Sequence, residues 1–143
     1  MNSELLIGEA AKDSAEHTDI HLPFGLLGFE RIKNYSLIPA PGAAPFSWLQ
    51  MAGDPSLAFL VISPDEVLPT YFPEISEEDV DYLDLTNPDD AGILNIVTLH
   101  PGGSATVNLK GPIVYNRNTL IGKQVVLLNA TEYALKYSLP LAP

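Results

Sequence analysis

The residues best suited to chemistry in this chain are three histidines and a dense set of carboxylates. His17 and His21 are four residues apart, and a strand would place both on one face together with Asp19. A metal ion would need further ligands that the neighbouring sequence does not supply. The absence of cysteine also excludes thiolate zinc sites, cysteine nucleophiles and disulfides. We therefore predict no metal site and no cofactor.

Motifs of the common enzyme classes are missing. No G-x-S-x-G elbow frames any serine, and "PGGS" at 101–104 lacks the Lys and the strand-loop-helix setting of a phosphate loop. Paired carboxylates in 74–90 fall on a predicted helix or in loops, where solvated acids are ordinary. We predict that the protein is not an enzyme and has no catalytic residues and no small-molecule substrate. The alternative is a small β-barrel enzyme or sugar-binding module that uses carboxylates, which a buried carboxylate pair in a deep pocket would favour.

The charge of the chain is strongly negative and unevenly distributed. The formal net charge is −11, ten of the 18 acids lie between Asp65 and Asp90, and no Lys or Arg occurs between Lys33 and Lys110. Such a surface repels nucleic-acid phosphates, so we expect no direct nucleic-acid binding. It would attract a basic protein partner, although a plain solvated acidic surface is the alternative.

Three segments are candidates for partner contacts. Tyr71 and Phe72 lie in a proline-bracketed acidic loop, "PDEVLPTYFPEI", and one of the two rings is expected to be exposed. The other two are a predicted acidic helix and the polar face of a predicted strand over 105–109. The predicted partner-binding residues are Asp65, Tyr71, Phe72, Glu74, Glu77, Glu78, Asp81, Thr106, Asn108 and Lys110.

The elements that position these residues are mostly short strands separated by 13 prolines and ten glycines. We predict strands over 20–22, 36–38, 46–51, 57–63, 93–99, 105–109, 113–115 and 123–128, with 57–62 in the middle of the sheet because both of its faces are apolar. One short helix near residues 77–83 is capped by Ser76. The predicted fold is mostly β: a small antiparallel β-barrel or sandwich-like single domain.

The domain is predicted to span residues 18–143, after a flexible N-terminal extension over residues 1–17. That extension carries acids where a signal peptide needs a basic start, and no apolar run is long enough to span a membrane. We therefore expect a cytoplasmic protein with no membrane partner.

Five motifs, taken together, resemble the flagellar assembly factor FliW family. They are "FGLLGFE" at 24–30, "PFSWLQ" at 45–50, "DPSLAFLVISP" at 54–64, "ATVNLKGPIVYN" at 105–116 and "GKQVVL" at 122–127. The matches keep their order and cover roughly residues 20–139. Each is weak alone, and the combination is specific.

The resemblance implies a non-enzymatic regulator with a small β-barrel-like fold. It implies binding to newly made flagellin near its C-terminal helical region. It also implies binding to the RNA-binding translational regulator CsrA, away from the RNA surface, which relieves repression of flagellin synthesis. The two would be alternative partners. The resemblance assigns no site residues in this sequence, so the ten residues named above remain predictions from physical argument.

Overall fold

The computed structural model describes residues 17–40, 45–54, 56–64 and 68–139. Within these ranges the chain forms nine strands, one α-helix and two 3-10 turns. The strands are β1 (Thr18–His21), β2 (Asn34–Pro39), β3 (Phe46–Met51), β4 (Ala58–Ile62), β5 (Ala91–Leu99), β6 (Ala105–Val107), β7 (Ile113–Asn116), β8 (Gly122–Gln124) and β9 (Tyr137–Leu139). The helix is α2 (Glu77–Tyr82), and the 3-10 turns are η2 (Pro88–Asp90) and η3 (Ala130–Glu132).

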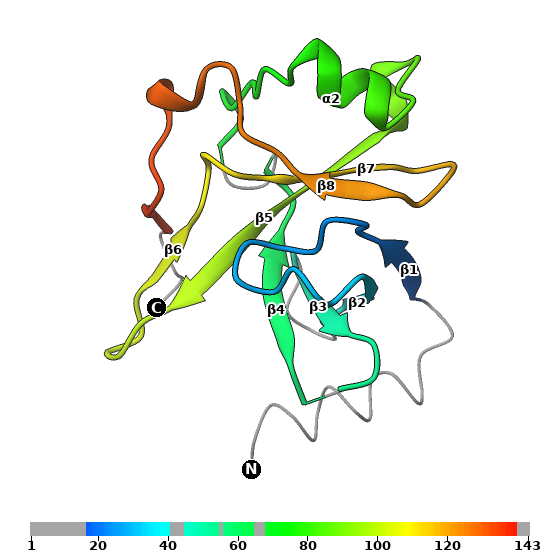
Figure 1. Ribbon diagram of the computed structural model, residues 1–143. Helices are drawn as coiled ribbons and strands as arrows, with labels where there is room; N and C mark the ends of the chain where they lie inside the picture. Colours follow the sequence, from blue (N-terminus) through cyan, green and yellow to red (C-terminus); the bar gives the residue numbers. More distant parts are fainter. Residues whose placement is uncertain (1–16, 41–44, 55, 65–67, 140–143) are drawn as a thin grey trace.

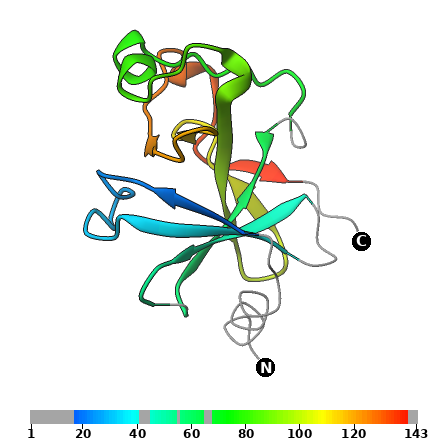
Figure 2. The same ribbon diagram turned by 90° about the vertical axis from the view of Figure 1, so that its right-hand side faces the viewer.

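All strand pairs are antiparallel, in the order β1-β2-β3-β4-β5-β6-β9, while β7 pairs with β5 and β8. The sheet curls into a half-barrel, with α2 at the end opposite the β3–β4 turn (Figures 1 and 2). A bridge between His21 and Ile121 joins the first strand to the segment just before β8. The predicted fold class is confirmed, including the central position of β4 between β3 and β5.

Two apolar clusters form the core, and β7 separates them. Ile113 and Tyr115 pack into the first cluster, with side chains from β1, β2 and β3, whereas Val114 packs into the second. Every residue of β7 is buried. Because side chains alternate across a strand, β7 contributes to both clusters at once. The second cluster also takes Tyr71 and Val125 from the segments beside α2.

Residues 105–116 run along one edge of β5 as a single strand with an interruption. Val107 lies opposite Val97, and Ile113 lies opposite Leu94, so six steps on one strand match three on the other. The three extra residues form a turn that the Asn108 side chain holds. Its Oδ1 accepts hydrogen bonds from the backbone N–H groups of Lys110 and Gly111, both at 3.0 Å. The predicted strand over 105–109 therefore ends at Val107.

The single described helix is short and is held at both ends. Ser76 Oγ accepts a hydrogen bond from the Asp79 N–H at 3.1 Å, which satisfies one of the free N–H groups of the first turn. At the other end the Asn116 side chain donates to the Leu83 and Asp84 carbonyls at 2.9 and 3.2 Å. The predicted helix at 77–83 is confirmed.

Beyond the early end at Val107, the structure differs from the predicted strands at β9 and after Gln124. β9 was not predicted, because its three residues are too few to show a pattern, and they become a strand by pairing with β6. The strand predicted over 123–128 ends at Gln124, since its partner β7 begins at Ile113, opposite that residue. The predicted extension over residues 1–17 lies outside the described residues except for His17, so its flexibility stays a prediction.

Candidate protein-interaction surface

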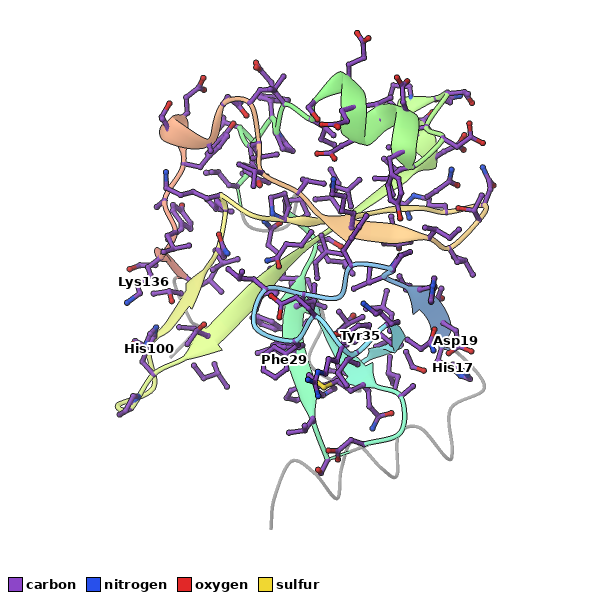
Figure 3. The ribbon with its side chains drawn as sticks, viewed as in Figure 1. His17, Asp19, Phe29, Tyr35, His100 and Lys136 are labelled. Atoms are coloured by element: carbon purple, nitrogen blue, oxygen red, sulfur yellow. The ribbon has the colours of Figure 1, made fainter. Side chains whose placement is uncertain are left out.

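Each of the three histidines interacts with a different neighbour. His17 lies 3.5 Å from Asp19, His21 Nδ1 is 2.7 Å from Asn34 Oδ1, and His100 Nε2 is 2.8 Å from Thr106 Oγ1. Figure 3 shows His17 and Asp19 at the β1 edge and His100 on the other side of the sheet. In the described residues no three His, Cys, Asp or Glu side chains are grouped so that they could hold a metal ion.

One carboxylate is buried within the described part of the chain, and it is paired with a lysine. Asp79, on the inner side of α2, accepts a hydrogen bond from Lys123 Nζ. The Lys123 ammonium lies 5.6 Å from the ring centroids of both Phe24 and Tyr82, which are themselves 5.5 Å apart. This cluster ties α2 to β8 and to the loop that carries Phe24. It holds a single acid, and a glycosidase-like mechanism requires two.

The predicted aromatic loop contains one buried and one exposed ring, as expected. Tyr71 Oη donates to the Leu109 carbonyl at 2.6 Å, and its ring packs edge-on against Tyr133. Burial raises the pKa of Tyr71 above its usual value. Phe72 keeps 70% of its surface exposed. Of the two rings, only Phe72 is available to a partner.

The Phe72 loop is held in place by Asn129, a residue that no sequence pattern singled out. The Asn129 side chain accepts from the Glu74 N–H at 2.9 Å and donates to the Phe72 carbonyl at 3.0 Å. The Phe72 N–H in turn donates to Tyr133 Oη at 2.9 Å. These bonds fix the loop backbone, so the exposed ring is presented without a large entropic cost.

The predicted acidic contacts lie on the outer surface of α2 and beside it. Glu74, Glu77, Glu78 and Asp81 are exposed. Asp65 lies outside the described residues, so its role stays a prediction. The helix places its acids at one end of the half-barrel (Figure 1).

The predicted polar face of residues 106–110 is occupied by contacts within the protein. Thr106, Asn108 and Lys110 are half-buried. Thr106 contacts His100, Asn108 holds the turn described above, and Lys110 Nζ donates to the Ala130 carbonyl at 2.9 Å. The expectation that these three residues form an outward strand face is wrong for Asn108 and Lys110, because the strand stops at Val107.

A strongly apolar depression on the described surface was not predicted. It is a groove of about 440 Å³, here called the apolar groove. Its rim is formed by the exposed side chains of Phe24, Leu27, Val126 and Leu135, and its floor includes buried Leu26 and Val125. Leu27 and Val126 are 84% and 80% exposed, which is unusual for side chains of this kind.

A glycine-dependent turn creates one wall of the apolar groove. Gly25 has φ +66°, and a Cβ there would lie 2.6 Å from Phe29 O and Glu30 Cα. The turn is closed by hydrogen bonds from Gly25 N to Leu22 O and from Phe29 N to Leu26 O, at 2.8 and 2.7 Å. It buries Leu26 and turns Leu27 outward. Beside it, the Gly28 N–H holds the pKa of the Glu30 carboxyl below its ordinary value.

Taken together, the fold and this surface define a small β domain whose prominent features are those of a protein-binding module: an apolar groove, an exposed aromatic loop and an acidic helix. The described residues contain no helix long and apolar enough to cross a membrane.

Comparison with known proteins identifies the family. A sequence model of the family described as "FliW protein" matches residues 5–139. The chain belongs to this family of flagellar assembly factors, which points to a regulatory or chaperone-like role rather than a catalytic one.

Relatives and a solved structure agree with the assignment. The flagellar assembly factor FliW of Moorella thermoacetica is 34% identical over 122 residues, which are 84% of this chain and 77% of that protein. The same factor of Leptospira biflexa is 41% identical over 110 residues, 75% of this chain and 71% of that protein. A crystal structure of the flagellar assembly factor FliW superposes with a TM-score of 0.77 and 32% identity, covering 86% of each chain.

Proposed function

We propose that this protein is a non-enzymatic, cytoplasmic regulator with two alternative partners. One is flagellin, bound at flagellin's own C-terminal helical region, and the other is a CsrA-type RNA-binding regulator. Binding of the CsrA-type regulator by this protein would relieve repression of flagellin synthesis. Free flagellin, by binding this protein instead, would release the CsrA-type regulator. The observation that carries the proposal is membership of the FliW family. The exposed apolar and acidic features described above, with no cluster of metal-ligating side chains in the described residues, support it.

Electrostatics favour a basic partner for the α2 end of the molecule. The net charge is −11, and Glu77, Glu78 and Asp81 project from α2. An RNA-binding regulator is basic because it binds phosphates, so long-range attraction would speed its association with this surface. Direct nucleic-acid binding by the protein itself is disfavoured for the same reason.

Phe72 is the proposed apolar anchor near this acidic surface. Its ring borders a depression of about 320 Å³, lined also by Leu68, Pro69 and Arg117. Aromatic side chains on a fixed backbone are frequent hot spots of binding energy. Truncation of such a ring to Ala typically costs about 2 kcal/mol of binding energy, or about thirtyfold in affinity.

The proposal is tested by measuring binding of purified flagellin and of the CsrA-type protein from the same bacterium by surface plasmon resonance. Charge reversal of Glu77, Glu78 and Asp81 together should slow association of the basic partner more than it speeds dissociation, and added salt should reduce the wild-type association rate. Phe72→Ala should keep the wild-type melting temperature and lose affinity for one partner. Failure of the wild-type protein to bind either partner would overturn the proposal.

A further inference from the structure

We propose that the apolar groove binds one amphipathic helix of a protein partner, a helix with a row of apolar side chains flanked by Lys or Arg. This inference rests on the proposed function, in which a helical segment of flagellin is a partner, and assigns that segment to a surface. It distinguishes this surface from the Phe72 loop, none of whose residues line the groove. The rim residues Phe24, Leu27, Val126 and Leu135 supply the contacts.

The occupant must be mainly apolar because the uncharged polar side chains that line the groove already have partners. Gln124 accepts from the Leu27 N–H at 2.9 Å and donates to the Gly111 carbonyl at 3.2 Å. Asn108 and Lys110 are held by the turn and by the Ala130 carbonyl. A polar ligand such as a sugar would find few free donors or acceptors here, whereas apolar side chains would remove the exposed rim from water.

The backbone hydrogen bonding beside the groove suits a helix better than an extended peptide. Extended peptides bind by pairing with a free main-chain edge. Beside the groove, the N–H groups of Val125 and Leu27 already donate, to the Pro112 carbonyl and to Gln124. A helix needs no such edge, since it inserts side chains at positions i, i+3 or i+4, and i+7, a row about 10 Å long. A groove of about 440 Å³ accommodates such a row.

The charges around the groove select a cationic flank. Glu30 lies on its lining, and its low pKa keeps the carboxylate ionised. Helix α2, with its acids, lies next to the groove, because the Tyr82 ring of that helix packs in a tilted arrangement against the rim residue Phe24. Of the neighbouring cations, Lys110 on the groove lining donates to the Ala130 carbonyl, and Lys123 is paired with Asp79. Lys or Arg residues beside the apolar stripe would therefore face carboxylates on two sides.

The test uses a synthetic peptide of the C-terminal helical region of flagellin and full-length flagellin, both titrated into the intact protein by calorimetry. Leu27→Asp and Val126→Asp should each weaken binding at least about tenfold, since each places a charge in the apolar rim. The matched control is Leu57→Asp, at an exposed leucine in the β3–β4 turn, which should leave affinity unchanged. Glu30→Gln should weaken binding severalfold at low salt and less at high salt.

Thermal melts of each variant accompany the titrations. Leu27→Ser and Val126→Ser replace any aspartate variant that does not fold, and the same loss of affinity is expected from them. Equal affinity of the wild type and the folded groove variants would overturn the groove assignment and leave the proposed function standing. Binding of full-length flagellin without binding of the peptide would overturn the helix as occupant. If the wild type binds neither, the flagellin part of the proposed function fails, and this inference fails with it.

Discussion

Replacement of Lys123 by Met should destabilise the protein by about 2–3 kcal/mol. The Lys123 and Asp79 side chains retain 28% and 9% of their exposure, so the pair is intermediate between buried and surface ion pairs. Breaking a buried pair by removing one partner costs about 3–5 kcal/mol, and exposed pairs contribute about 0–1 kcal/mol. Loss of the charge over the Phe24 and Tyr82 rings adds about 0.5 kcal/mol for each contact. Met preserves most of the apolar stem.

Removing the charge of the other partner, Asp79, should reduce the free energy of unfolding by a smaller amount. Asp79→Asn leaves Lys123, which water can still reach, and we expect a loss of about 1.5 kcal/mol. The double variant strands no charge and should lose only about 1 kcal/mol, so the two substitutions are strongly non-additive. Urea unfolding of the four proteins, followed by circular dichroism, gives the coupling energy directly. A Lys123→Met variant within about 0.5 kcal/mol of the wild type, or additive effects in the cycle, would refute the reasoning.

Three further predictions concern groups in the core and the loop. Tyr35→Phe should stabilise the protein by about 1 kcal/mol, because the buried Tyr35 hydroxyl has no hydrogen-bond partner among the described residues. Tyr71→Phe should instead destabilise the protein by about 1 kcal/mol, because it removes the hydrogen bond to the Leu109 carbonyl. Urea unfolding measures both changes. Burial raises the pKa of both phenols above 10.0, so these groups ionise at lower pH in the unfolded state than in the folded state. The free energy of unfolding should therefore fall above about pH 10, and less steeply in Tyr35→Phe. Urea unfolding between about pH 8 and about pH 11 tests the direction of this change. Asn129→Ala should release the Phe72 loop and increase amide hydrogen exchange at Glu74. Unchanged exchange at Glu74 would contradict the role of Asn129 in holding this loop.

Sequence patterns predicted the strands well where the apolar residues alternate. Ala105, Val107 and Leu109 are all buried, as their spacing indicates, although the strand itself stops before Leu109. The pattern could not show that stop, because the turn depends on the Asn108 side chain and on Asn95, which donates to the Asn108 carbonyl from β5 at 2.9 Å. Burial was thus readable from the sequence, and the hydrogen bonding that interrupts the strand was not.

The interaction surface was predicted only in part. Acids on α2 and one exposed aromatic followed from composition and proline spacing. The apolar groove did not, because Leu27 lies in a glycine-rich turn and Val126 follows a three-residue strand, where periodicity carries no information. Their exposure is decided by which neighbours the fold places beside them. The nearest signal was the run "FGLLGFE", in which two leucines lie between two glycines and a phenylalanine lies on either side, so that a turn cannot bury all four apolar side chains.

The position of β7 between the two core clusters has a consequence for how the protein folds and unfolds. Neither cluster can be completed without this strand, so neither half of the molecule is a stable unit on its own. Its pairing with β5, and the bridge from His21 to Ile121 just before β8, join segments that are separated in the sequence, which makes the loop-closure entropy of the folding transition state large. We expect a single cooperative transition, with folding in milliseconds to seconds. A newly synthesised chain would acquire either core only after the ribosome has released β7 and β8.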